Sequence, residues 1–440
     1  MTRAERFWPA VAPLTAAAFL ALCTVDVGAA MTLALAAGAV FAARARMWGV
    51  AMCAAAWTAV FVAVYVLPGP YDSWAGRAAV PVLGLYVGAF LIAWVVGRRL
   101  AARSTEERPL LGWPSDRRVL AYLALLLAVG VVAAFLRFRG VTPPLFDANP
   151  DAARQVLRER ANIFVGLLSE AWTLGMAISL LRALTTRGPR LLFFLALAAV
   201  FTCGAALGAS KNSVLVGVVP ALVAALSVRR NRPRVLRTIP KAPVVAVLLL
   251  GVAAVGTAVF LGGQRTLAGS GTFEDEFRSK YGDNVVSSSV GSLDLSLSSS
   301  VETFGRLWAQ RSTMDPEYGG YSLLFLGSRV EPIVGTVDLY GATSQLSLPY
   351  YMNTATFAAI PVLDWGPVGA AAFLVLLGLG VGFAERRLEF SASPAAQLGR
   401  AFVVYFAVFG VYELYPFIYP TWLSLIPGLW VLHRLGRAAT

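Results

Sequence analysis

The chain has 440 residues, of which 58% are hydrophobic and only 14% are charged. Soluble domains contain about 45–50% apolar and about 25% charged residues, so the composition excludes a string of soluble domains and predicts a polytopic membrane protein. The net charge of +13 would also suit a nucleic-acid-binding protein, but in a membrane protein it first indicates basic cytoplasmic loops. The three cysteines lack metal-ligand or redox spacing and the single histidine is His433, which argues against a disulfide scaffold, a cysteine- or histidine-based metal site and histidine-based catalysis.

Apolar runs near the length that a membrane helix needs, about 20 residues, predict an all-α protein with about twelve transmembrane helices. The runs are 8–25, 27–43, 48–67, 78–97, 118–136, 162–181, 191–208, 212–228, 242–262, 366–384, 401–415 and 418–433. We expect the first run to be a retained signal-anchor helix, because a second apolar run follows it almost at once.

Basic residues assign the orientation of these helices. If the N-terminus is inside, the inside segments hold 24 of the 37 basic residues but only six of the 24 acidic residues, as the positive-inside rule requires. Both termini are therefore expected in the cytoplasm. The predicted organisation is a nine-helix region over 1–262 with an arginine-bearing external loop at 137–161, a large external loop over 263–365, and three helices over 366–440. No internal repeat is evident, so an inverted-repeat transporter is not supported.

The arginines of the external loop 137–161 depart from the positive-inside rule. Asn149 and Pro150 predict the start of a helix, on which Arg154 and Arg158 are four residues apart and share a face. Because a guanidinium binds phosphate through two parallel hydrogen bonds, these two side chains are candidate diphosphate ligands at the outer membrane face. Anchoring to lipid headgroups is the alternative. The same alternatives apply to the other arginines of this loop: Arg137, Arg139 and Arg160.

Two further cations lie at predicted external helix ends. Lys211 belongs to a small polar segment, GASKNSV, in which backbone donors and a helix N-terminus are accessible to an anion. Arg265 follows Gly262 and Gly263, which allow a ligand to approach the backbone closely. Both are candidate diphosphate ligands, and contact with lipid headgroups or snorkelling is the alternative.

The large external loop, 263–365, supplies candidate carboxylates. Residues 274–276 form an acidic run that looks like a metal-binding motif, but a solvated charge run is the favoured interpretation. The serine-rich segment 287–300 is either mobile or one face of an interfacial segment. It is followed by a predicted amphipathic helix in which Glu302 and Arg306 form an i,i+4 pair.

Charged residues later in this loop stand in apolar surroundings, where charges tend to be paired or functional. They are Arg329, Glu331 and Asp338. Two earlier arginines, Arg306 and Arg311, are weaker candidates for substrate binding than for structural pairs.

Segment 353–369 predicts a re-entrant half-helix, because polar residues lead into a short apolar stretch and Pro361, Gly366 and Pro367 then predict a break before the tenth transmembrane helix. The glycine-rich run 378–382 lies within that helix, so we attribute it to helix packing. Within the predicted helices Glu170 and Glu413 are the costly acids, and each is either functional or the partner of an arginine.

Three features resemble the O-antigen polymerases, the Wzy-like family of oligosaccharide repeat-unit polymerases. The first is segment 353–369, which reads NxxT, then Pro361, then DWGxxG. The second is YGGYS at 318–322, and the third is the layout of many helices with enlarged third and fifth external loops. Family members often carry arginine where this chain has Lys211, and lysine keeps the charge but lacks the bidentate fork.

The resemblance implies a GT-C-like fold and a glycosyltransferase of the bacterial inner membrane that needs neither metal nor cofactor and whose active site faces outside. Such an enzyme transfers a glycan from polyprenyl diphosphate to the non-reducing end of a lipid-linked acceptor repeat unit in surface polysaccharide synthesis. Membrane lipid, a chain-length regulator and a flippase are further candidate partners, and nucleic acid is not. The implied diphosphate ligands are Arg154, Arg158, Lys211, Arg265 and Arg329. The implied candidates for the catalytic base are Asp338, Glu331, Glu302 and Asp364.

Other functions share part of this pattern. An O-antigen ligase, which transfers the whole glycan to a different acceptor, would also use external arginines and a long loop. A flippase for lipid-linked oligosaccharides should instead line a central cavity with charges from many helices, whereas here the basic residues gather at the external rim. A GT-C enzyme with a metal-binding acid pair in its first external loop is disfavoured, because that loop contains only Asp26.

Overall fold

The computed structural model describes residues 26–66, 75–102, 113–147, 153, 156–157, 163–186, 188–208, 211–230, 272–313, 321, 356–389, 391, 393–411 and 421–437. These residues form helices, turns and irregular segments, and no strand occurs among them. Their contacts divide them into two compact units. The first unit contains the described residues within 1–103, 256–383 and 406–418, and the second contains those within 104–255, 384–405 and 419–440.

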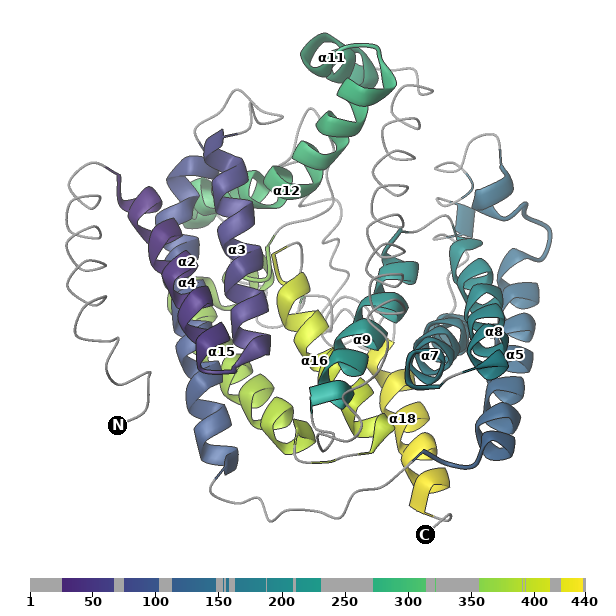
Figure 1. Ribbon diagram of the computed structural model, residues 1–440. Coiled ribbons are helices and arrows are strands. Elements are labelled where there is room, and N and C mark those ends of the chain that lie inside the picture. The colour runs from purple at the N-terminus through teal and green to yellow at the C-terminus, as the bar shows by residue number, and fades with distance from the viewer. Residues whose placement is uncertain are drawn as a thin grey trace. The chain divides into compact units, whose positions relative to one another are not determined.

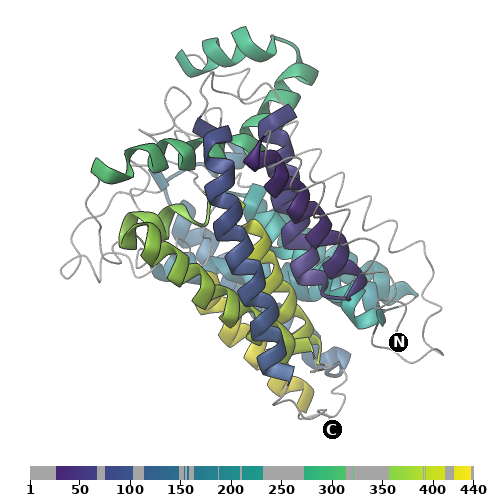
Figure 2. The same ribbon diagram turned by 90° about the vertical axis from the view of Figure 1, so that its left-hand side faces the viewer.

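Three apolar helices begin the first unit (Figures 1 and 2). They are α2 (Val27–Arg44), α3 (Trp48–Val66) and α4 (Ala75–Ala102). Asp26 caps α2, because its carboxylate accepts hydrogen bonds from the backbone N–H groups of Gly28 and Ala29 at 2.7 and 3.1 Å. The Tyr65 hydroxyl donates to the same carboxylate at 3.1 Å, so the end of α3 is fixed beside the start of α2.

The helices of the large loop belong to this unit, and the later part of α12 lies beside the start of α4 (Figure 1). They are α11 (Thr272–Tyr281), α12 (Val285–Gln310) and the short 3₁₀ turn η3 (Arg311–Thr313). Asn284 caps α12 by accepting a hydrogen bond from the backbone N–H of Ser287 at 2.8 Å. Later in α12, Gly305 lies so close to the Ala75 carbonyl group that a Cβ atom there would overlap it. The serine-rich segment is thus part of a helix that packs on α4.

Helix α15 (Ala359–Glu389) contains the break that the sequence predicts. Gly366 has φ 66° and ψ −178°, a conformation open to glycine and strained for other residues. Pro367 follows, and a proline disfavours helical geometry in the residue before it. A short helix up to Trp365 therefore precedes a long helix that continues to Glu389.

The glycine-rich run of α15 packs against α4, as expected from the sequence. Gly378 and Gly382 lie against the carbonyl groups of Phe90 and Trp94, and any Cβ atom at either glycine would overlap them. Small residues four positions apart let two membrane helices approach at backbone distance. Gly380, between them, faces open space.

The second unit contains the described helices from α5 to α9 and the helices near the end of the chain. They are α5 (Asp116–Phe138), η1 (Pro144–Phe146), α7 (Ile163–Thr185), α8 (Pro189–Ala206), α9 (Lys211–Arg230), α16 (Pro394–Phe409, up to Tyr405) and α18 (Thr421–Arg437). Trp172 of α7 fills the space left by Gly130 of α5 and Gly204 of α8. Ser424 of α18 donates a hydrogen bond to the Leu167 carbonyl of α7 at 2.8 Å.

Seven described helices are long and apolar enough to cross a membrane: α2, α3, α4, α5, α7, α8 and α15. The protein is therefore a multi-pass membrane protein. Shorter apolar helices lie at 213–225 and 394–409, and α18 has 17 residues. The predicted runs 8–25 and 242–262 lie outside the described residues. The count of twelve and the three-part division at 262 and 365 stay predictions.

Helix α16 begins at Pro394, earlier than the apolar run that starts at 401. The Ser393 hydroxyl accepts a hydrogen bond from the backbone N–H of Ala396 at 3.1 Å, and Pro394 occupies the first helical position. Serine and proline are favoured at these positions. The apolar run does not include residues 394–400 because this part of the helix contains the polar residues Gln397 and Arg400.

Candidate functional site

The predicted site residues divide into two groups. Glu302 and Asp364 are described, and Lys211 is the first residue of α9, although its side chain lies outside the described part. The weaker candidates Glu170, Arg137, Arg139, Arg306 and Arg311 are also described. The following candidates lie outside the described residues and stay predictions: Arg154, Arg158, Arg160, Arg265, Arg329, Glu331, Asp338 and Glu413.

Glu302 of α12 is buried at the start of α4. Its side-chain oxygen Oε2 accepts a hydrogen bond from the backbone N–H of Gly76 at 2.5 Å. Its other oxygen, Oε1, lies 3.6 Å from Nε of Arg306, which confirms the predicted i,i+4 pair. Only 7% of the residue is exposed. The carboxylate therefore binds one of the backbone N–H groups that a helix leaves unsatisfied at its N-terminus.

Burial of Glu302 raises the pKa of its carboxyl group above the ordinary glutamate value, and the hydrogen bond from Gly76 and the nearby Arg306 guanidinium partly oppose that rise. Burial removes the carboxylate from water and so disfavours its charged form, and this effect is larger than the two opposing interactions. A glutamate with a raised pKa holds its proton more readily than a solvated one. This is the protonation behaviour expected of a general acid or base, and it also arises at buried structural sites.

Asp364 occupies the last turn of α15 before the break at Gly366. Its side chain is fully buried, and Oδ1 accepts a hydrogen bond from the backbone N–H of Tyr321 at 2.9 Å. Tyr321 belongs to the segment YGGYS at 318–322, and Asp364 to the segment DWGxxG. The two short motifs behind the family resemblance are thus in direct contact, which the sequence did not predict.

Several buried hydroxyl groups lie on α12 and just before the start of α15. Within the described part of the chain, the hydroxyls of Ser299, Thr303 and Thr356 are buried without a hydrogen-bond partner. A neighbouring hydroxyl, that of Ser300, donates to the Val411 carbonyl at 2.8 Å. Buried polar groups are normally paired, so each of these hydroxyls could still bind a polar ligand or a water molecule. From the sequence, the serine-rich composition of this segment could be read, but not which of its residues are buried.

An aromatic group joins α12, α4 and α15. The hydroxyl of Tyr86 donates to the Pro367 carbonyl at 3.0 Å, directly after the break in α15. The ring of Tyr86 meets Phe304 and Trp308 edge to face, with centroids 6.5 and 6.2 Å apart. The guanidinium of Arg311 lies over the Trp308 ring, 4.2 Å from its centroid. These contacts hold α12 against α4, which carries the Gly76 partner of Glu302, and they join α4 to α15, which carries Asp364.

The second unit holds its own buried or half-buried acids. Glu170 of α7 accepts a hydrogen bond from the Thr421 hydroxyl at 3.3 Å. Glu385 is fully buried and lies 3.0 Å from the Arg400 guanidinium, which is also 3.5 Å from Glu389. From the sequence, Arg400 was interpreted only as one of the basic residues that orient the helices in the membrane.

The acidic run of α11 behaves as a solvated charge run at its described residue. The side chain of Asp275 is 76% exposed and lies 3.8 Å from Arg278. Among the described residues no group of three or more histidine, cysteine, aspartate or glutamate side chains is placed to hold a metal ion.

Comparison of the chain with protein-family models, with curated proteins and with solved structures finds no match. Its function is therefore argued from its own residues. The described part of the first unit contains the buried carboxylates of Glu302, which contacts the start of α4, and of Asp364, which lies just before the break in α15, and three buried hydroxyls without a partner.

Proposed function

We propose that the protein is a polymerase of lipid-linked oligosaccharide repeat units, a GT-C-like glycosyltransferase of a bacterial inner membrane with about twelve transmembrane helices and an active site that faces outside. The donor is a glycan on polyprenyl diphosphate, and the acceptor is a second lipid-linked repeat unit. Neither a metal nor a cofactor takes part.

The observation that carries this proposal is the hydrogen bond between the Tyr321 N–H and the Asp364 carboxylate. It joins the end of the large loop to the break in α15. The two segments that resemble the polymerase family in sequence therefore meet in space, as expected for parts of one site. The unpaired hydroxyl of Thr356, which belongs to the same motif as Asp364, adds a polar group that a glycan can bind.

In the proposed reaction an acceptor sugar hydroxyl attacks the anomeric carbon of the donor sugar. A glycosidic bond forms as the bond from that carbon to the diphosphate oxygen breaks, and polyprenyl diphosphate leaves. A carboxylate takes the hydroxyl proton. Cations stabilise the negative charge that develops on the diphosphate. Those cations are Arg154, Arg158, Lys211, Arg265 and Arg329.

The contacts of the described carboxylates refine their roles in this proposal. Asp364 holds a backbone N–H of the loop, and Glu302 holds the start of α4. We therefore assign both to positioning, with Asp338 and Glu331 as the candidates for the base. Asp364→Asn keeps an oxygen that accepts the Tyr321 hydrogen bond, so it should retain chain elongation, whereas Asp364→Ala should abolish it. Loss of elongation in both variants at normal abundance would make Asp364 the base.

The test is an assay of the purified full-length protein with a polyprenyl-diphosphate oligosaccharide and no nucleotide sugar. A ladder of longer lipid-linked glycans is the expected product, and Arg154→Ala or Arg265→Ala should abolish it without lowering protein abundance. Arg434→Ala, in the second unit's last helix, is a matched control that should elongate normally. A glycan transferred to a different acceptor would identify a ligase. Lipid movement without any product would identify a flippase.

A further inference from the structure

Three charged side chains meet where α5 begins, α7 ends and α8 begins, within the second unit. One carboxylate oxygen of Asp116 binds the Arg182 guanidinium, and the other accepts a hydrogen bond from NH1 of Arg190 at 2.8 Å. Arg182 also lies over the Trp113 ring, 5.0 Å from its centroid. One carboxylate is thus shared by two guanidiniums, which leaves a surplus of one positive charge. Nε of Arg182 is buried and has no hydrogen-bond partner among the described residues.

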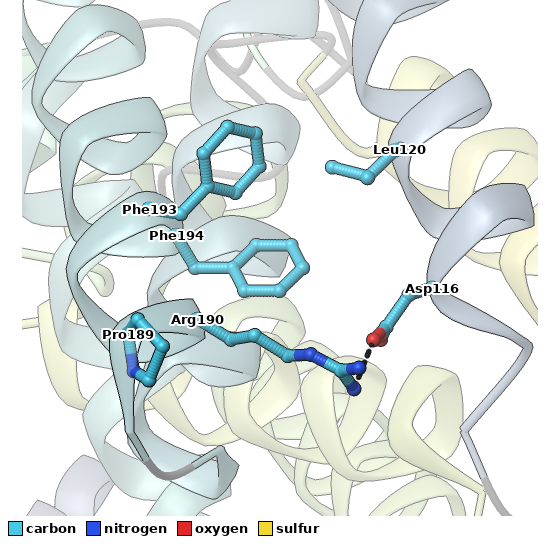
Figure 3. A pocket seen from close by; sticks show the side chains of 6 residues that line it. All are labelled: Asp116, Leu120, Pro189, Arg190, Phe193 and Phe194. Carbon is cyan, nitrogen blue, oxygen red and sulfur yellow. Dashed lines mark hydrogen bonds and ion pairs between the residues drawn. The ribbon is translucent and has the colours of Figure 1, made fainter.

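An open groove of about 430 Å³ adjoins this cluster (Figure 3). It is lined by Asp116, Leu120, Pro189, Arg190, Phe193 and Phe194. Figure 3 shows the Asp116–Arg190 pair at one end of the groove and the side chains of Leu120, Phe193 and Phe194 toward the other. The charged end is formed by the first residues of α5 and α8, and the apolar end by residues about one turn further along each helix.

Both helices are long and apolar enough to cross a membrane, so the groove has a fixed orientation relative to the lipid. Its charged end lies at the helix starts, near the membrane surface, and its apolar end lies deeper. A membrane lipid has the same arrangement of headgroup and acyl chain. The surplus positive charge favours an anionic headgroup over a zwitterionic one, and basic pockets between membrane helices on the cytoplasmic side are known to bind anionic headgroups. The arginine distribution predicts that this side is cytoplasmic.

We propose that the groove binds an anionic glycerophospholipid, with the headgroup phosphate on Arg190 and one acyl chain beside Leu120 and Phe193. The Arg190 side chain is 71% exposed, so it can bind a phosphate with the part of its guanidinium that does not contact Asp116. The planar guanidinium suits this because it offers several donors in a fixed geometry. The site does not depend on the proposed polymerase activity.

Native mass spectrometry of the delipidated full-length protein tests the proposal. The protein is titrated with phosphatidylglycerol or with phosphatidylcholine of the same acyl chains. We expect tighter binding of phosphatidylglycerol, and Arg190→Ala should weaken it by about 10-fold, the size of one charge-assisted contact. Arg434→Ala is the matched control, because Arg434 is an exposed arginine of the same unit that lies over Trp430 at 4.9 Å, outside the groove.

Two further variants separate lipid binding from a structural role. Asp116→Asn removes the carboxylate that competes for both arginines, so it should strengthen phosphatidylglycerol binding, whereas a structural cluster would lose binding or show no change. Leu120→Trp should obstruct the apolar end and weaken binding without changing any charge. Thermal unfolding of each variant identifies the ones that remain folded, and Arg190→Ala alone decides the question if Asp116→Asn unfolds.

Besides lost or unchanged binding by a folded Asp116→Asn variant, three outcomes would overturn the proposal. The first is equal binding of phosphatidylglycerol and phosphatidylcholine, or equal binding by the Arg190→Ala and Arg434→Ala variants. The second is displacement of the lipid by millimolar inorganic phosphate, which would indicate a simple phosphate site. The third is a preference of 10-fold or more for a polyprenyl phosphate, which would indicate a site for a lipid carrier.

Discussion

Two buried carboxylates of the first unit, those of Glu302 and Asp364, bind backbone N–H groups, whereas that of the buried Asp294 accepts hydrogen bonds from the hydroxyls of Tyr281 and Ser298. Glu302 accepts a hydrogen bond from Gly76 at 2.5 Å, and Asp364 accepts one from Tyr321 at 2.9 Å. Each bond joins residues that are distant in the sequence, one between α12 and the start of α4 and the other between the large loop and α15. These carboxylates fix the course of the chain.

Two carboxylates of the second unit, those of Glu385 and Asp116, bind guanidiniums instead, whereas that of Glu170 accepts a hydrogen bond from the Thr421 hydroxyl. Glu385 is paired with Arg400 at 3.0 Å, and Asp116 is shared by Arg182 and Arg190. A backbone N–H needs only an acceptor, which an amide oxygen also supplies, whereas a buried guanidinium needs a negative charge. Replacing the acid by its amide should therefore cost little at Glu302 and Asp364 and much at the buried Glu385.

The largest effect is expected for Glu385→Gln. This change leaves the Arg400 guanidinium buried with a single carboxylate, that of Glu389 at 3.5 Å. Removing one partner of a buried ion pair costs about 3–5 kcal/mol, and the remaining carboxylate places this case near the lower end. Equilibrium unfolding of the purified protein in mixed micelles, followed by tryptophan fluorescence, measures the change. A loss below about 1 kcal/mol would remove the contrast between the units.

The double variant Glu385→Met/Arg400→Met sharpens this result. Two apolar side chains of similar size replace the pair, and such replacements are often neutral or stabilising. The double variant should therefore be more stable than Glu385→Gln alone. If the double variant is less stable than Glu385→Gln, the ion pair itself stabilises the protein. The loss of stability in Glu385→Gln would then not come from leaving the Arg400 charge buried without its partner.

A smaller effect is expected at Asp364. Asp364→Ala leaves the Tyr321 N–H buried without an acceptor, which costs about 1–3 kcal/mol. Asp364→Asn keeps an acceptor oxygen, so its free energy of unfolding should lie within about 1 kcal/mol of the wild type. The same unfolding assay compares them. Equal losses in both variants would show that the charge of Asp364, and not its acceptor oxygen, holds the loop.

The sequence predicts the features that depend on residues close together in the chain. The Glu302–Arg306 pair follows from helical spacing, the break at Gly366 from neighbouring glycine and proline, and the packing of α15 from its glycine-rich run. The bonds to Gly76 and Tyr321 follow from none of these. Every residue except proline carries a backbone N–H, so a side chain that binds one leaves no residue pattern at the partner position. Gly76 and Glu302 are, moreover, 226 residues apart.

The Arg400 pair was missed for a related reason. The positive-inside rule explains any arginine near a helix end, and Arg400 fits that rule. The rule does not say whether the side chain is solvated or buried, and here it is buried against Glu385. The groove beside Asp116 was missed because it is formed by helices α5 and α8, whose residues approach only in the folded chain.

At Glu302 the expected effect is smaller again. Glu302→Ala removes the acceptor of the Gly76 N–H and should lower the free energy of unfolding by about 1–2 kcal/mol, whereas Glu302→Gln keeps it. The interaction with Arg306 is lost in both variants, but at 3.6 Å on a partly exposed side chain it contributes little. A Glu302→Gln variant as unstable as Glu302→Ala would place Glu302 with the guanidinium-bound carboxylates of the second unit.

The smallest expected effect is the pH dependence of the difference between the wild type and Glu302→Gln. Burial raises the pKa of Glu302 in the folded protein, so the folded state holds this proton more tightly than the unfolded state, in which the pKa is about 4.3. Raising the pH then favours unfolding. The wild type should lose stability relative to Glu302→Gln as the pH rises from the unfolded value through the higher folded value, and the difference should be constant above it. If the wild type instead gains stability relative to Glu302→Gln over this pH range, the Gly76 hydrogen bond and Arg306 outweigh burial. Glu302 would then be held as a charged group.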